Sequence, residues 1–299
     1  MSQRSSTRRT LDELRTLYSL FPDVREVLVE GNHDRIFLVA FIVECESEAV
    51  VFAVDDRVLV EKDLVDAAGV DEGARGRLIA IAHAIQQWDE NERAHLTCLV
   101  DADRGYLGQG SGIPFSYPEL VVTDLGSIEV YALTKSCIRK FLSVVLRVEV
   151  AVDLDTFVSS LESALVELFL ARAVLHESGC GISLHEKAAK YGRHDGGVVQ
   201  YSADELLTRT LPGDKNADLL SELKTRVTQM RKDLPKDDLR RAVRGHDIAP
   251  VLIHALQLKN DFAHPETVER ALCGCVDWVD LRQQHTFAAL LERVGTKAA

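Results

Sequence analysis

The sequence predicts an α/β fold with a largely parallel sheet and flanking helices, followed by an α-helical C-terminal region. Two observations predict the sheet: an apolar strand that ends on Glu30, and a second apolar strand that is followed by the acidic pair Asp101 and Asp103. A third observation predicts the helical region, because helical patterns dominate beyond about residue 152. We therefore expect a domain boundary near residue 150.

The first domain, residues 1–150, alternates helices with strands, which is typical of a parallel sheet. It begins with a helix that Thr10 and Asp12 are placed to cap, and Pro22 ends that helix. Turn-forming residues and β-branched runs delimit the remaining elements. In chain order we predict helices at 10–21, 33–45, 73–91 and 127–146, and strands at 26–30, 49–54, 95–100 and 120–123.

The second domain, residues 151–299, has helical patterns almost throughout. It contains no convincing internal repeat, and no clear linker separates it from the first domain. We predict helices at 153–178, 202–209, 217–232, 248–259 and 267–294.

The composition is that of a soluble globular protein, with 46% hydrophobic and 27% charged residues. The longest apolar window, Ile36–Val43, is too short to cross a bilayer, so we expect no membrane-spanning segment. The six cysteines form no CxxC pair, which favours reduced thiols in a cytoplasmic protein over a metal site. The net charge of −12 argues against a protein that coats nucleic acid but is compatible with a nuclease. The basic segment 224–244 is either a phosphate-steering patch or a solvated face, because acids interleave its Lys and Arg residues.

The carboxylates at the strand ends predict a divalent metal site for phosphodiester chemistry. The carboxyl ends of parallel strands share one edge of a sheet, where ligands bind. Mg²⁺ takes oxygen ligands and keeps several waters, so a few carboxylates suffice, and Mn²⁺ is the alternative ion. Such a metal lowers the pKa of the attacking water and neutralises charge on the phosphoryl group. The predicted metal ligands are Glu30, Asp101, Asp103, Asp124 and Glu129.

Several of these side chains also have a structural interpretation. Asp34 and Glu129 fall in the first turns of predicted helices, where acids commonly act as caps or dipole partners. His33 can orient a phosphate, or it can lie in a surface turn. His246 can shuttle protons at the site, or the neighbouring Asp247 can begin the next helix as its cap.

Four short segments carry a family resemblance. Val29-Glu30-Gly31-Asn32-His33-Asp34 resembles the first Toprim motif of the OLD-like nucleases, and Val100-Asp101-Ala102-Asp103 resembles their Asp-x-Asp motif. Val122-Thr123-Asp124 with Ile128-Glu129, and Arg244-Gly245-His246-Asp247-Ile248, resemble segments of a Toprim-like family. The best-known members of that family are the nuclease effectors of PARIS-type anti-phage systems. The resemblance covers about residues 25–260.

This resemblance implies a Toprim-like catalytic domain and a Mg²⁺-dependent nuclease that cleaves tRNA to stop translation. It also implies an ABC-type ATPase partner that holds the nuclease inactive, and a homodimer. Catalytic roles fall to Glu30, Asp34 and Lys135. The assignment of Lys135 departs from the family pattern, because no motif fixes a lysine and Lys135 lies on a different helical face from Glu129. We assign substrate binding to His33, Arg104 and His246.

Two other functions stay open at this point. An OLD-like DNA nuclease or nickase would use the same metal chemistry, because RNA and DNA present the same phosphodiester. A non-catalytic subunit that binds the ATPase is the alternative from another class, although a site without chemistry has no physical need to collect repelling carboxylates. A nucleotide triphosphatase is disfavoured, since the sequence contains no Gly-rich phosphate loop.

Overall fold

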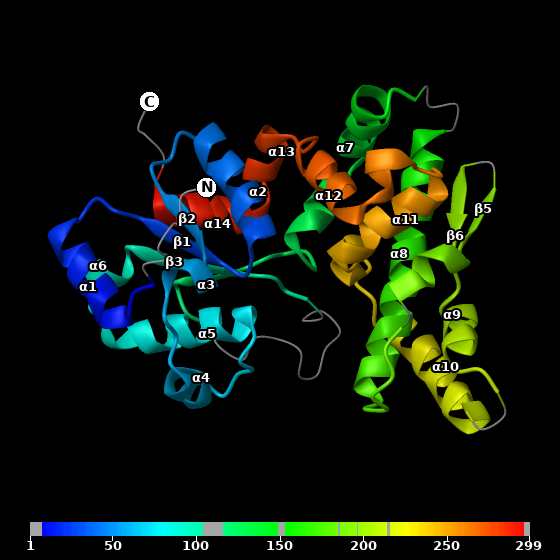
Figure 1. Ribbon diagram of the computed structural model, residues 1–299, viewed down its shortest axis with the longest axis horizontal. Coiled ribbons are helices and arrows are strands. Elements are labelled where there is room, and N and C mark those ends of the chain that lie inside the picture. Colours follow the sequence, from blue (N-terminus) through cyan, green and yellow to red (C-terminus); the bar gives the residue numbers. More distant parts are fainter. Residues whose placement is uncertain are drawn as a thin grey trace. The chain divides into compact units, whose positions relative to one another are not determined.

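The computed structural model describes residues 8–103, 116–148, 153–184, 186–195, 197–213 and 216–295. These residues form two compact units (Figure 1). Unit 1 consists of residues 8–101, 116–124 and 278–295, and unit 2 consists of residues 102–103 and the described part of 125–277.

A four-stranded sheet organises unit 1, and all of its neighbouring strands run parallel. The order across the sheet is β2-β1-β3-β4. Every residue of the two central strands, β1 and β3, is buried, as expected for parallel strands that are covered on both faces. The strands are β1 Glu26–Val29, β2 Val50–Ala53, β3 Leu96–Val100 and β4 Leu120–Val122. The predicted α/β fold class and the positions of all four predicted strands are thereby confirmed.

Helices cover both faces of this sheet. Figure 1 shows α2 and α14 on one side and α5 on the other. The sequence fixes the start of α1 through a capping box, in which the Thr10 hydroxyl accepts the Glu13 N–H and the Glu13 carboxylate accepts the Thr10 N–H. The helical elements of unit 1 are α1 Leu11–Leu20, α2 Asn32–Glu44, α3 Val54–Arg57, α4 Lys62–Ala68, α5 Ala74–Ala84, the 3-10 turn Ile85–Gln87, α6 Glu90–Arg93, α13 Trp278–Arg282 and α14 His285–Val294.

Each face of the sheet has its own apolar packing. On one side, Leu14 of α1 and Leu78 of α5 share a buried cluster with Leu28 and Cys98 of the sheet. On the other side, the rings of Phe37 and Phe41 on α2 pack against Phe287 of α14, with centroids 6.1 and 4.9 Å apart. The C-terminal helix is therefore part of the core of unit 1.

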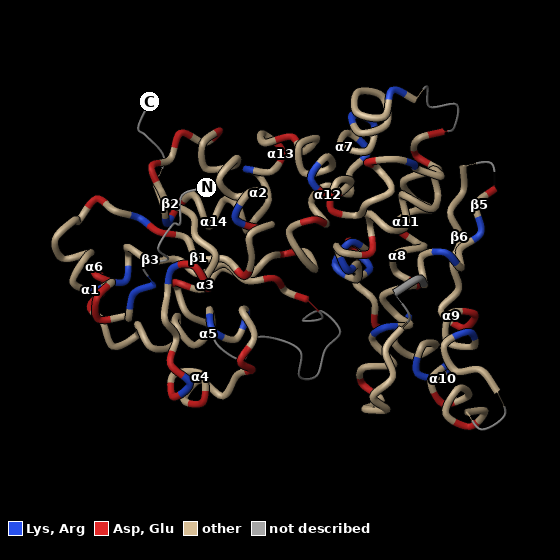
Figure 2. The backbone as a smooth tube through the Cα atoms, in the orientation of Figure 1, with Lys and Arg blue, Asp and Glu red and all other residues tan. Residues whose placement is uncertain are grey.

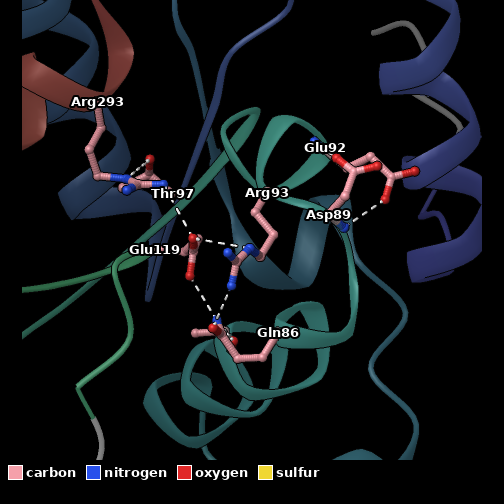
Figure 3. Close-up of polar contacts among 8 residues, drawn as sticks. Gln86, Asp89, Glu92, Arg93, Thr97, Glu119 and Arg293 are labelled. Carbon is pink, nitrogen blue, oxygen red and sulfur yellow. Dashed lines mark hydrogen bonds and ion pairs between the residues drawn. The ribbon is translucent and has the colours of Figure 1, made fainter.

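Polar contacts fasten α14 and α6 to the amino ends of β3 and β4 (Figure 3). The Arg293 Nε of α14 donates to Thr97 Oγ1 of β3 at 3.2 Å. Glu119, which directly precedes β4, lies 3.9 Å from Arg293 and 3.7 Å from Arg93 and accepts a hydrogen bond from Gln86 at 2.7 Å. A buried carboxylate thus joins three segments that are distant in the sequence.

Unit 2 is mainly helical and is built around α8, which packs against α9, α10 and the hairpin strand β6. The strands of that hairpin, β5 and β6, run antiparallel. No helix in the described ranges of the chain has both the length and the apolar character needed to cross a membrane. The regular helices are α7 Lys135–Lys140, α8 Leu154–Glu177, α9 Ala203–Thr210, α10 Ala217–Lys232, α11 Ile248–Ala255 and α12 Pro265–Cys273. The hairpin strands are β5 Arg193–Asp195 and β6 Val198–Gln200, and short or irregular turns are η3 Ile128–Ala132, η4 Phe141–Val145, η5 Glu186–Tyr191, η7 Leu239–Ala242, η8 Gly245–Asp247 and η9 Asn260–Ala263.

Several features differ from the sequence predictions. The helix expected at 73–91 is divided into α5, the 3-10 turn Ile85–Gln87 and α6, and the hairpin strands β5 and β6 were not predicted. The helix expected at 127–146 is divided into η3, α7 and η4, because Thr134 leaves the helical conformation and caps α7 through the Cys137 N–H. The helix expected at 267–294 is divided into α12, α13 and α14. The units also differ from a single boundary near residue 150, since residues 125–148 belong to unit 2 and residues 278–295 belong to unit 1.

Candidate functional site

The order of the strands identifies the place in unit 1 where a ligand is expected. The chain leaves β1 for β2 on one side and returns to β3 on the other, so the topological switch point lies between β1 and β3. In open parallel sheets, ligands bind outside the carboxyl ends of the strands at this point. Glu30 directly follows β1 and Asp101 directly follows β3. Two of the predicted site carboxylates therefore stand at the switch point.

Glu30 and Asp101 are also in direct contact. The backbone N–H of Asp101 donates a hydrogen bond to Glu30 Oε1 at 3.1 Å, and both residues are half-buried. This bond turns the Glu30 side chain from its own strand toward the end of β3.

Asp34 lies in the first turn of α2, where it acts as a capping residue. Its Oδ2 accepts the backbone N–H of Gly31 at 2.9 Å. The capping interpretation of Asp34 is therefore correct for one of its oxygens. His33 precedes it in the same turn and is half-buried. Both side chains follow β1 immediately, so they belong to the carboxyl edge of the sheet.

Asp124 follows β4 and is held by the C-terminal helix. The backbone N–H of Asp124 donates to Thr286 Oγ1 at 2.8 Å, and the Thr286 hydroxyl donates to Asp124 Oδ1 at 2.6 Å. Thr286, in the first turn of α14, is fully buried. Thr123 extends the β4 ladder by donating its N–H to Val100 O at 3.0 Å, which brings Asp124 to the same edge as Asp101. Sequence reasoning missed Thr286, because no local pattern indicates a partner 162 residues away.

The remaining predicted acids belong to unit 2. Asp103 is exposed, has a left-handed backbone conformation with φ of 49°, and donates its N–H to Gly126 O at 2.9 Å. Glu129 lies in η3 rather than in a regular helix, and only 6% of it is exposed. A Cβ on Gly126 would come within 2.3 Å of Val243 O, so the glycine permits the close approach of two backbone segments.

Unit 2 brings Glu129 and His246 together, although the sequence suggested them separately. His246 Nδ1 lies 3.8 Å from Glu129 Oε1 and 3.7 Å from Glu269 Oε1 of α12. The neighbouring carboxylates of Glu269 and Glu129 raise the pKa of His246 above its usual value. A Cβ on Gly245 would lie 2.2 Å from Ser127 Oγ and 2.5 Å from Glu129 Oε2, so these two motif segments meet only because residue 245 is glycine. Glu269 is a neighbour that sequence reasoning missed.

Other predicted residues have structural partners. Asp247 is buried and forms a bidentate pair with Arg172 of α8, at 2.9 and 2.8 Å, and no side-chain cap bond from Asp247 to α11 is found. Lys135 begins α7, and its Nζ lies 2.5 Å from the exposed Asp155. Arg104 lies outside the described residues.

The basic segment 224–244 is interleaved with acids in space as well as in sequence. Figure 2 shows both signs of charge along α10. The Arg226 guanidinium pairs with Glu222 one turn earlier, and Arg231 binds Glu167 of α8. Arg241 pairs with Asp237 four residues earlier, as Arg226 does with Glu222. These pairs favour the interpretation of this segment as a solvated, internally neutralised face.

The predicted site residues therefore divide between the units. Unit 1 gathers Glu30, Asp34, Asp101 and Asp124 at one edge of its sheet, and unit 2 contains Asp103, Glu129, Lys135 and His246. Comparison with known proteins assigns no family: no protein-family model matches the chain, and no curated protein matches it significantly.

Proposed function

We propose that this protein is a Mg²⁺- or Mn²⁺-dependent phosphodiester hydrolase that uses the carboxyl edge of the unit 1 sheet as its metal site. The observation that supports this proposal is the contact between Glu30 and Asp101 at the switch point of the sheet. Four side chains of this edge also fit a hard divalent cation, because Glu30, Asp34, Asp101 and Asp124 offer carboxylate oxygens.

In this proposal each residue of the edge has a definite part. Glu30 and Asp101 are the main ligands, and the Asp101 N–H holds the Glu30 carboxylate in place. The bound cation would activate a water and neutralise the charge that develops on the phosphoryl group. Asp34 fixes the first turn of α2, whose amino end carries partial positive charge and favours an anionic substrate. Asp124 supplies a further carboxylate from the end of β4.

The substrate and the biological role are proposed from the Toprim resemblance. The resemblance favours an endonuclease that cleaves tRNA during anti-phage defence, that is restrained by an ABC-type ATPase, and that acts as a homodimer. The roles of Asp103, Glu129, Lys135 and His246 in such an activity rest on the same resemblance. The OLD-like DNA nuclease differs from this proposal only in its substrate.

A non-catalytic binding subunit is the second candidate, and one observation favours it. Asp34 caps its own helix, and Asp124 accepts a hydrogen bond from Thr286. Two of the four unit 1 carboxylates therefore have structural roles. Glu30 distinguishes the two candidates, because the proposed metal site requires its charge.

The test is to incubate the purified full-length protein with total tRNA and, separately, with plasmid DNA, in Mn²⁺ or Mg²⁺ and in EDTA. We expect discrete tRNA fragments that disappear in EDTA and with Glu30→Gln. Glu44→Gln is the matched control, because Glu44 is exposed at the other end of α2. Nicked plasmid in place of tRNA fragments would assign the DNA nuclease. Cleavage by Glu30→Gln at the wild-type rate would contradict the proposed site.

Because the assay with purified protein offers only two candidate substrates, the same variants are also expressed in cells that lack the ATPase partner. Growth arrest by the wild type and by Glu44→Gln, but not by Glu30→Gln, would support the enzyme. Equal growth with all three proteins, together with no cleavage in the tube, would favour the binding subunit.

A further inference from the structure

We propose that Thr286 is a positioning residue of the metal site, which orients the Asp124 carboxylate toward the cation from the C-terminal helix. This inference rests on the proposed function, because it assigns Thr286 a part in the same site. No motif and no comparison points to Thr286. Its assignment comes from the hydrogen bonds that join α14 to the end of β4.

The geometry ties Asp124 to a single atom twice. Thr286 Oγ1 accepts the Asp124 backbone N–H at 2.8 Å and lies 2.6 Å from Asp124 Oδ1. A hydroxyl has one proton to donate. Thr286 Oγ1 lies farther from Val122 O, at 3.3 Å, so the hydroxyl donates its hydrogen bond to the Asp124 carboxylate. Backbone and side chain of Asp124 are thereby fixed relative to each other, which sets the direction of the carboxylate.

The helix that carries Thr286 is itself held firmly. Phe287, the next residue, is fully buried, and its ring lies 4.9 Å from the ring of Phe41 on α2. At the far end of α14, Arg293 donates to Thr97 of β3. Metal ligands are commonly oriented by hydrogen bonds from neighbouring side chains, and Thr286 offers such a bond to Asp124. Losing a bond of this kind typically weakens metal binding by about 10- to 100-fold.

The competing explanation is purely structural. An acid beside the first turn of a helix also stabilises that helix through its dipole, so Asp124 can hold α14 without any metal. The two explanations differ in what the Thr286 hydroxyl controls. A positioning residue changes the affinity for the cation, whereas a structural contact changes only the stability of unit 1.

The experiment is Mn²⁺ binding to the full-length protein, measured by calorimetry and by loss of the free-ion electron paramagnetic resonance signal. The variants are Thr286→Val, which removes the hydroxyl at nearly constant volume, and Thr286→Ser, which keeps it. We expect Thr286→Val to bind Mn²⁺ about 10- to 100-fold more weakly than the wild type and Thr286→Ser to bind close to it. When Asp124 is already Asn, adding Thr286→Val should change the affinity little, because Thr286 acts through Asp124.

A second variant keeps the test decisive if Thr286→Val fails to fold. Asp124→Asn retains an Oδ1 that accepts the Thr286 hydroxyl, so the contact to α14 persists while the charged ligand is lost. We expect this variant to fold and to bind Mn²⁺ more weakly, and wild-type affinity would overturn the inference. Wild-type affinity in Thr286→Val would overturn it as well but would leave the proposed function standing. An absence of Mn²⁺ binding by the wild type would instead remove the proposed function, and this inference with it.

Discussion

Replacing Glu119 by alanine should destabilise unit 1 strongly. Only 3% of Glu119 is exposed, and its carboxylate faces the guanidinium groups of Arg93 and Arg293 and the amide of Gln86 (Figure 3). Removing one partner from a buried ion pair lowers the free energy of unfolding by about 3–5 kcal/mol, because the other charge stays buried without a counter-charge. The side chains of Arg93 and Arg293 are 22% and 21% exposed, so water recovers part of this cost. We therefore expect a loss of about 2–3 kcal/mol in the free energy of unfolding.

Tryptophan fluorescence in urea is the assay, since it follows unit 1 alone. The chain has two tryptophans, Trp88 and Trp278, and both belong to unit 1. With an m-value of about 2 kcal/mol per molar urea, the expected loss lowers the midpoint by about 1–1.5 M. Glu119→Gln should fall between the wild type and Glu119→Ala, because the amide oxygen still accepts from Gln86 while the charge is lost.

The control is Glu72→Ala, which breaks an exposed pair between Glu72 and Lys62, both 70% exposed. Exposed pairs contribute little, so the midpoint of this variant should match the wild type. Should Glu119→Ala and Glu72→Ala unfold at the same urea concentration, the reasoning that the buried carboxylate holds α14 and α6 to the sheet would be refuted.

Two further predictions concern unit 2. Gly245→Ala places a Cβ 2.2 Å from Ser127 Oγ and 2.9 Å from Glu129 Cβ, so the unfolding free energy should fall by about 1–3 kcal/mol. Thermal unfolding followed by circular dichroism measures this loss. Gly274→Ala, whose Cβ would meet nothing closer than 3.5 Å, is the control, and equal melting of the two variants would show that the contact relaxes freely. Cys180 should be the first of the buried and half-buried thiols to react with a disulfide reagent near pH 7, because a hydrogen bond involving Ser178 lowers its pKa, whereas burial raises the pKa of Cys98 to about 12. The advantage of Cys180 should shrink as the pH rises and other thiols ionise. A fast phase that survives in Cys180→Ser would contradict the assignment.

The sheet of unit 1 was predictable because its signals are local. Each strand is a short apolar run bounded by turn residues, and the acids that end β1 and β3 lie next to those runs in the sequence. Parallel strands bring their carboxyl ends to one edge, so the contact between Glu30 and Asp101 follows from the pattern once the strands are assigned.

Features that depend on distant partners were not predictable in the same way. The strands β5 and β6 are three residues each, and the sequence Arg193-His194-Asp195 has no strand character apart from its pairing. The division of the helix expected at 127–146 did leave a local signal, because Thr134 is a β-branched residue of a type that commonly caps helices. The assignment of residues 278–295 to unit 1 depends on the packing of Phe287 and the bonds of Thr286, which no local pattern encodes.

The discontinuous course of unit 1 has a consequence for how the chain is made. Domains generally fold during synthesis in order from the N-terminus, but the helix that completes one face of this sheet is translated after all of unit 2. Until Phe287 arrives, the rings of Phe37 and Phe41 lack their partner on α14, and the chain must carry that apolar surface while all of unit 2 is being translated. A nascent chain halted after unit 2 would contain a complete helical unit and an incomplete sheet. Aggregation of the incomplete sheet is the hazard during that interval.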